Sequence, residues 1–191
     1  MLHSAAEASR TVGLKTQHMC ARLENAEVSR PAFLQQCTRL VAASVGCSRA
    51  GVWVFRHTAR GQELHCLAMY DGVGDRMTAV QDEAGEHVHT YFQTLEQVGY
   101  VIAADAQTHF ATAGFFSDRL KPRGVRSMMA ASFSVNGSLF GAFTCTQVGC
   151  AMEWSRPQLN VLRQIGSRAS LALATYDART ALDTRPAELP V

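Results

Sequence analysis

Histidines and cysteines are the side chains of this 191-residue sequence whose types could support catalysis or metal binding. His87 and His89 are separated by one residue, a spacing that would place both imidazoles on one face of a strand. The neighbouring Gly85 and Glu86 instead indicate a loop or a helix start, and on a helix the two rings would point apart. We expect polar loop residues here, and a haem or metal sensor that uses His87, His89 or His109 stays open as an alternative.

The sequence contains six cysteines, and thiol chemistry is the second possibility that it raises. They are widely spread, form no Cys-x-x-Cys pair and follow no secretion signal, which favours reduced thiols over disulfides or a zinc site. Two of them fall in expected strands and are interpreted as small core residues. The six cysteines are Cys20, Cys37, Cys47, Cys66, Cys145 and Cys150. Nothing in the sequence requires a cofactor.

Composition and charge narrow the class of protein. Hydrophobic residues make up 47% of the chain and charged residues 18%, which is typical of a folded globular protein. The formal net charge of +2 is scattered, so we expect neither nucleic acid nor an anionic membrane as a partner. No apolar run reaches the roughly 18 residues of a membrane-spanning helix, and the N-terminus lacks a leader pattern, so a cytoplasmic location is expected.

Apolar residues at helical spacing predict the elements that must position any site. Long helices are expected near residues 5–25, from Pro31 to Gly46 behind a Ser29 cap, and from Ser155 to about Tyr176. Shorter helices are expected near residues 85–98 and 114–121.

Alternating and β-branched runs predict strands at residues 50–55, 63–70, 100–104, 127–135 and 139–146. Asn136-Gly137 between the last two is a strong hairpin signal. Strands enclosed by terminal helices indicate an α+β fold, in which helices cover an antiparallel sheet.

The order of these elements resembles a GAF domain from Pro31 to Ala174. Gly141 is expected to permit a close approach or a bulge, and Asp105 to accept backbone N–H groups rather than a ligand. Gln158 stands where the family usually has an acidic residue, which predicts a weaker helix cap. The matching segments are Ala50–Phe55, Leu64–Asp71, Val101–Ala106, Val135–Thr144 and Trp154–Gln158.

The resemblance implies a sheet of about six strands with the terminal helices on one face and a roofed pocket on the other. The expected divisions are an N-terminal helical extension at residues 1–28, a GAF-like domain at 29–177 and a flexible tail at 178–191. Candidate ligand-pocket residues lie on the strands or in the roof: Trp53, Phe55, Tyr70, Tyr91, Phe92, Phe115, Phe116, Arg126 and Thr144.

The function that the resemblance implies is that of a non-enzymatic sensory or regulatory module, common in bacterial signalling, that binds a small molecule or acts as a signalling scaffold. A separate signalling protein is an expected partner. We also expect a homodimer through the terminal helices, because Val12, Met19 and Leu23 form an apolar stripe with few partners nearby in sequence.

Known activities of the family supply the alternatives. A thiol-dependent methionine sulfoxide reductase is one, although the glycine-rich cysteine loop of that branch is missing between Ala79 and Thr90. Bilin-binding members attach their chromophore through a roof cysteine, and no cysteine lies between Cys66 and Cys145. The signature of cyclic-nucleotide-binding members is not recognisable either.

Overall fold

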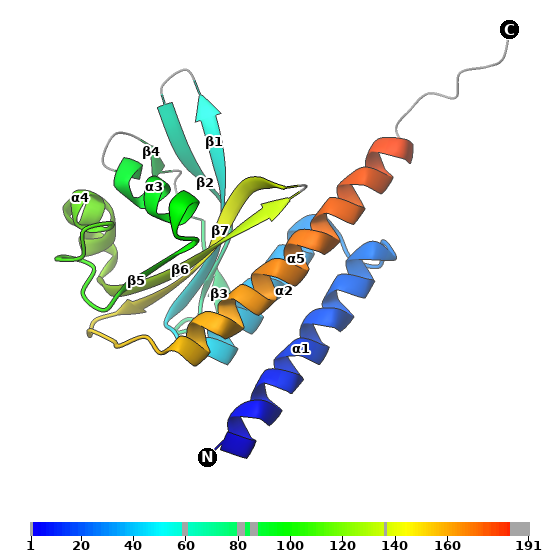
Figure 1. The fold of residues 1–191 in the computed structure, drawn as a ribbon, viewed down its shortest axis with the longest axis horizontal. Coiled ribbons are helices and arrows are strands. Elements are labelled where there is room, and N and C mark those ends of the chain that lie inside the picture. The colour runs from blue at the N-terminus through cyan, green and yellow to red at the C-terminus, as the bar shows by residue number, and fades with distance from the viewer. Residues whose placement is uncertain (1, 59–60, 80–82, 85–87, 136, 184–191) are drawn as a thin grey trace, which may run out of the picture.

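The computed structural model describes residues 2–58, 61–79, 83–84, 88–135 and 137–183 (Figure 1). Its long helices are α1 (Leu2–Glu24), α2 (Arg30–Val45) and α5 (Arg156–Asp183). Ser29 caps α2 as expected, since its hydroxyl accepts the backbone N–H of Ala32. Gly46 ends α2 in the left-handed region at φ 74°, which a residue with a side chain rarely adopts. The tail was expected at residues 178–191, but helix α5 continues to Asp183, and residues 184–191 lie outside the described residues.

The strands form one antiparallel sheet in the order β3-β2-β1-β7-β6-β5. Two hairpins make its centre, β1 (Arg49–Thr58) with β2 (Gly61–Asp71), and β6 (Val125–Val135) with β7 (Ser138–Val148). The edge strand β5 (Tyr100–Ala103) pairs with β6, and the two-residue strands β3 (Arg76–Met77) and β4 (Glu83–Ala84) both pair with β2. This is the predicted α+β fold with a GAF-like sheet.

Three β-bulges interrupt the register of the sheet, at Leu67 on β2, Arg126 on β6 and Phe140 on β7, and the first two bear on the cavity. On β2, Val52 opposes Ala68 and Trp53 opposes Cys66, so Leu67 is an extra residue between them. On β6, Arg126 is extra in the same way. Because side chains alternate along a strand, each extra residue moves the side chains beyond it to the opposite face.

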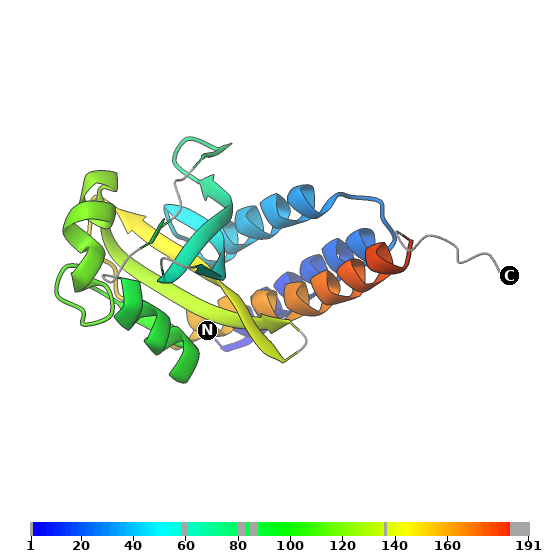
Figure 2. The same cartoon turned by 90° about the horizontal axis from the view of Figure 1, so that it is seen from above.

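Helices cover both faces of the sheet and create two hydrophobic cores (Figures 1 and 2). Helices α2 and α5 cover one face of the sheet and α1 packs on both of them, and we call these three the helix layer. The core beneath it contains Phe33, Phe143 and Leu162. The other face carries a roof made of α3 (His89–Gln97), α4 (Ala113–Phe115), the π-helical turn η2 (Phe116–Leu120) and the 3-10 turn η3 (Lys121–Arg123). Tyr91, Phe92 and Leu95 of α3 belong to the second core.

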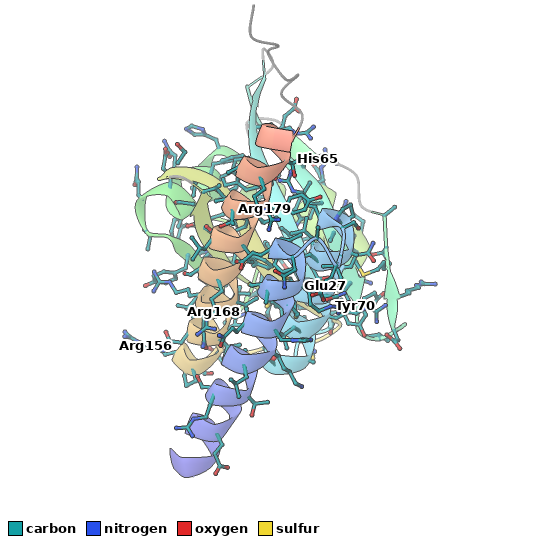
Figure 3. The ribbon with its side chains drawn as sticks, turned by 90° about the vertical axis from the view of Figure 1, so that its right-hand side faces the viewer. Glu27, His65, Tyr70, Arg156, Arg168 and Arg179 are labelled. Carbon is teal, nitrogen blue, oxygen red and sulfur yellow. The ribbon has the colours of Figure 1, made fainter. Side chains whose placement is uncertain are left out.

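Helix α1 packs parallel to α5 within the same chain (Figures 1 and 3). The Arg168 guanidinium donates to the carbonyl of Gly13 at 3.1 Å, and that of Arg179 donates to the carbonyl of Glu24 at the end of α1. Val12 and Leu23 of the predicted apolar stripe are buried, and Met19 packs partly against the same core. The stripe that motivated the homodimer is therefore covered inside one chain.

Gln158 strengthens the start of α5, contrary to the expected weaker cap. The side-chain carbonyl oxygen of Gln158 accepts from the Ser155 backbone N–H at 2.8 Å. The Ser155 hydroxyl in turn accepts from the Gln158 backbone N–H at 3.3 Å. This reciprocal pair is a capping box. The side-chain amide also donates to the carbonyl of Val45 at 2.8 Å. A carboxylate has no donor for that bond, so glutamine ties α5 to the end of α2.

None of the helices in the described ranges combines the length and hydropathy that crossing a bilayer requires.

Candidate ligand cavity

A cavity of about 270 Å³ lies between the sheet and the roof. Strands β1, β2, β6 and β7 supply its floor, and α3, η2 and η3 supply its cover. Most of its wall is apolar, and polar side chains gather at one end. The lining residues are Arg49, Trp53, Leu64, Met69, Asp71, Arg76, Thr78, Ala79, Val88, Tyr91, Phe115, Arg119, Leu120, Arg123, Val125, Met128, Thr144 and Thr146.

The polar end of the cavity follows one row of residues across the sheet. Arg76, Asp71, Arg49 and Thr146 are successive cross-strand neighbours on β3, β2, β1 and β7, and we call them the polar row. Arg49 lies 3.6 Å from the Asp71 carboxylate and donates to the carbonyl of Arg123 at 3.0 Å. The second bond joins the row to the roof.

The next rows along the strands form the apolar part of the cavity. Trp53 donates its indole N–H to the Thr144 hydroxyl at 3.1 Å, and both side chains are buried. Gly51 lies between them and Met69, where an added Cβ would come within 2.7 Å of the Met69 methyl carbon and 2.9 Å of the indole nitrogen. The absent side chain at Gly51 therefore lets these three lining residues gather.

Tyr91 of α3 lines the cavity and carries a buried hydroxyl. Its side chain is 1% exposed and makes an edge contact with Phe115, with ring centroids 5.5 Å apart. Among the described residues, no group hydrogen-bonds to the Tyr91 hydroxyl. Burial raises the pKa of this phenol far above its usual value, so the group is a neutral O–H. A buried hydroxyl without a hydrogen-bond partner is costly.

The structure brings four of the nine predicted pocket residues to the cavity: Trp53, Tyr91, Phe115 and Thr144. Phe55 and Phe92 pack against each other instead, with centroids 4.6 Å apart, in the core on the same face of the sheet. Phe116 is buried in that core without lining the cavity.

Tyr70 and Arg126 do not line the cavity, and the bulges at Leu67 and Arg126 explain why. Strict alternation from Leu64 would place Tyr70 above the cavity, but the bulge at Leu67 puts Met69 and Asp71 there and turns Tyr70 toward the helix layer. Arg126 is itself the extra residue of the second bulge and is exposed to solvent.

The lining residues that the sequence analysis missed include four arginines and Asp71. Arg49 alternates with Gly51 and Trp53 on β1, so its place on the cavity face could be predicted from the expected strand. Phe115, Arg119 and Arg123 recur at intervals of four, which is helical spacing.

The cysteines of the reductase alternative lie on opposite faces of the sheet. Cys145 belongs to the core under the helix layer, and burial raises the pKa of its thiol. Cys66 packs at the margin of the core under the roof. Neither residue lines the cavity, and the sheet separates their side chains, so the two thiols cannot form a disulfide without a rearrangement.

The histidines of the metal alternative are not brought together where they are described. The Nδ1 atom of His109 accepts from the Ala111 backbone N–H at 3.2 Å. Partial burial lowers the pKa of the His109 imidazole. His89 begins α3, and His87 lies outside the described residues. Within the described ranges, no group of three or more metal-ligating side chains occurs. Asp105 accepts from the Gln107 N–H at 2.9 Å, the structural role expected of it.

Residues 29–173 match the GAF domain family. A comparison with curated protein sequences finds no match.

Solved structures with this fold include the phycoerythrobilin-bound GAF domain of a cyanobacterial phytochrome, at a TM-score of 0.71 and 14% identity over 90% of this chain and 97% of that one. The phycocyanobilin-bound GAF domain of a cyanobacterial phytochrome gives 0.70 and 14%, covering 93% and 98%. The photosensory core module of a Stigmatella aurantiaca phytochrome gives 0.66 and 17%, covering 95% of this chain and 38% of that one.

Proposed function

The chain belongs to the GAF domain family, and we propose that it is a non-enzymatic sensory module whose cavity binds a small organic molecule without a covalent bond. The observation that carries this proposal is the cavity itself. Its volume is close to the lower limit of the roughly 300–1,000 Å³ of typical ligand pockets, and its wall is mainly apolar with a few polar groups.

Non-covalent binding is supported by the side chains of the cavity wall. The described lining residues include neither cysteine nor histidine. They offer no thiol for attachment of a bilin and no thiol or imidazole for nucleophilic chemistry. Because Cys66 and Cys145 are separated by the sheet, the reductase alternative lacks a thiol pair at the cavity.

The sheet supplies a physical route from the cavity to the terminal helices. Trp53 and Thr144 face the cavity, whereas Val52 and Phe143, their neighbours on the same strands, are fully buried in the core under the helices. Because adjacent residues point to opposite faces, a ligand that displaces β1 or β7 also changes the packing of α2 and α5. We propose that these helices pass the signal to a partner, either a second copy of the chain or a separate signalling protein.

A matched pair of substitutions tests the cavity. Leu120 lines the cavity from the roof, and Leu171 is 69% exposed on α5, so Leu120→Trp fills the site while Leu171→Trp adds the same ring elsewhere. The wild-type protein is analysed by native mass spectrometry for a co-purified molecule and then by a thermal-shift screen of metabolites. We expect compounds that raise the melting temperature of the wild type and Leu171→Trp but not of Leu120→Trp.

The proposal fails if no compound binds, or if binding is the same in Leu120→Trp as in the wild type. Biliverdin is included because related structures contain bilins. We expect no zinc-dependent fluorescent band after denaturing electrophoresis, and such a band would show covalent attachment and overturn the non-covalent part.

A further inference from the structure

Two cysteine thiols meet in the core under the helix layer. Cys47 lies between the end of α2 and the start of β1, and Cys145 lies on β7. The two thiols hydrogen-bond with each other, and neither is part of a disulfide. Because the Cys47 thiol donates to the carbonyl of Arg49 at 3.2 Å, the proton of the bond between the thiols comes from Cys145.

The segment that carries Cys47 is fixed to the end of β7. The Ser48 backbone N–H donates to the side-chain carbonyl of Gln147 at 3.2 Å, and the Ser48 hydroxyl accepts from the Val148 N–H at 3.2 Å. Cys145 and Gln147 are alternate residues of β7 and lie on the same face of the sheet. Cys47 is therefore held beside Cys145 by contacts on both sides of the chain.

The two thiols differ in access from solvent. Cys47 is 8% exposed and lines a surface groove together with Ser48 and Gln147, whereas Cys145 is 0% exposed. A small oxidant in the groove meets Cys47 first, and partly accessible cysteines are the ones that react. Burial, and then the hydrogen bond with Cys47, raise the pKa of Cys145, so this residue stays a thiol until Cys47 has reacted.

We propose that Cys47 and Cys145 form an oxidation site at which a hydroperoxide converts the two thiols into a disulfide. Cys47 attacks the peroxide as a thiolate. An S–O bond forms, the O–O bond breaks, the Cys47 proton leaves with the departing hydroxide as water, and Cys47 becomes a sulfenic acid. The Cys145 sulfur then attacks the Cys47 sulfur, so that an S–S bond forms, the S–O bond breaks, and hydroxide leaves with the Cys145 proton as water. The two sulfurs lose two electrons, which the peroxide gains.

The pair lies against the floor of the cavity. Cys145 stands between Thr144 and Thr146, whose side chains line the cavity on the other face of the sheet, and Cys47 lies two residues before Arg49. A disulfide requires the sulfur atoms to close to about 2 Å, which draws the start of β1 toward β7. Oxidation therefore alters the cavity floor. The oxidation itself goes beyond the proposed function, and only its regulatory consequence concerns the proposed site.

Thiol counting and peptide mapping of the full chain test the site. The reduced protein is freed of reductant and treated with a small molar excess of hydrogen peroxide, and the remaining thiols are alkylated. We expect the six free thiols to fall to four and the peptides of Cys47 and Cys145 to be joined. Dithiothreitol should restore all six.

Three variants assign the steps to residues. Cys145→Ala should leave Cys47 as a sulfenic acid that dimedone labels, without a disulfide, and Cys47→Ala should abolish both products. Cys150 is exposed and accepts a hydrogen bond from Gln147 at 3.7 Å, so Cys150→Ser removes a nearby thiol as the matched control and should form the disulfide as the wild type does. Circular dichroism establishes that each variant is folded.

The emission of Trp53, which lines the cavity, tests the regulatory consequence in a Trp154→Phe background. It should change on oxidation, return on reduction and stay constant in Cys47→Ala.

No loss of thiols in the folded wild type, an equal loss in Cys47→Ala, or a disulfide that includes another cysteine would overturn the oxidation site. Unchanged Trp53 emission in the oxidised protein would overturn its effect on the cavity. None of these measurements uses a ligand, so the metabolite screen and Leu120→Trp decide the proposed function separately.

Discussion

Asp75, in the turn between β2 and β3, connects two elements through its side chain. Its carboxylate accepts from the Tyr70 hydroxyl at 2.9 Å and from the Arg39 guanidinium at 2.8 Å. The guanidinium also lies over the Tyr70 ring, 4.7 Å from its centroid. The hydroxyl of Tyr70, and then Arg39, lower the pKa of Asp75 below its ordinary value. These contacts replace the pocket role predicted for Tyr70 with one in the β2–β3 turn.

Asp75→Asn is expected to lower stability at neutral pH but not in acid. Asparagine tolerates the positive φ of 43° at this position, so the substitution isolates the charge. Because the folded pKa is depressed, the stabilisation is present above the unfolded pKa of about 3.9 and is lost as pH falls through the folded value. Urea midpoints should therefore differ at pH 7 and converge below about pH 3.

Asp118→Asn, at an exposed aspartate of η2, is the control and should change neither midpoint. A gap between wild type and Asp75→Asn that stays constant from pH 7 to pH 3 would contradict the electrostatic account.

At the scale of elements, two glycines test how closely neighbouring elements pack. An added Cβ on Gly141 of β7 would lie 2.0 Å from the carbonyl oxygen of Trp53 on β1, whereas one on Gly166 of α5 would lie 3.5 Å from the Phe143 ring. Gly141→Ala must push two central strands apart, so we expect a loss of about 3 kcal/mol or more, or failure to fold.

Gly166→Ala should instead raise the free energy of unfolding by roughly 0.5–1 kcal/mol, because alanine favours the helix and has room. Urea denaturation of both variants measures the difference. Similar effects of the two substitutions would show that the close approach at Gly141 is wrong.

Gln158→Glu tests the link between α5 and α2. The carboxylate can keep the capping box with Ser155, but it loses the donor to the Val45 carbonyl and meets the negative end of α2. We expect a destabilisation of about 1–2 kcal/mol in thermal or urea unfolding. Gln17→Glu, exposed on α1, is the matched control. An unchanged or higher stability of Gln158→Glu would show that the bond to Val45 contributes nothing.

At the scale of the whole molecule, α1 is part of the packed helix layer. Val12, Thr16, Cys20 and Leu23 are buried. A chain that begins at Ser29 loses these contacts and exposes the face of α5 beneath them. Burial of each large apolar side chain stabilises the fold by about 1.5–3 kcal/mol. Because that stabilisation is lost, we expect the melting temperature to fall by on the order of 5–15 °C. An unchanged melting temperature would show that α1 does not stabilise the domain.

The homodimer stays a prediction, and its expected surface changes. With the α1 stripe covered inside the chain, a dimer through the terminal helices has to use their outward faces, where Leu14 and Leu171 are 62% and 69% exposed. We expect sedimentation equilibrium to show a dimer that Leu171→Gln weakens. A monomer at every concentration would exclude the dimer, and an equal dimer in Leu171→Gln would place the interface elsewhere.

The sequence by itself determined the elements, because their signals are local. Helical periodicity, the Ser29 and Ser155 caps and the alternating strands depend on residues within a few positions of each other, and α2, α5 and the two hairpins agree with them. The family resemblance predicted that the terminal helices cover one face of the sheet and a roofed pocket lies on the other. Trp53 and Thr144 were predicted at the cavity because they lie on central strands, and the extra residues Leu67 and Arg126 lie on other strands, β2 and β6.

Only the tertiary structure decided which side chains share the cavity. The extra residue Leu67 on β2 places Met69 and Asp71 at the cavity, where strict alternation would place Tyr70. On β6, the extra residue Arg126 points to solvent, and Val125 lines the cavity in its place. The position of a bulge depends on how a strand packs against its neighbours, so it leaves little trace in the strand's own residues. The arginines meet for the same reason: strand pairing and the roof place Arg49, Arg76 and Arg119 together, although they are far apart in the chain.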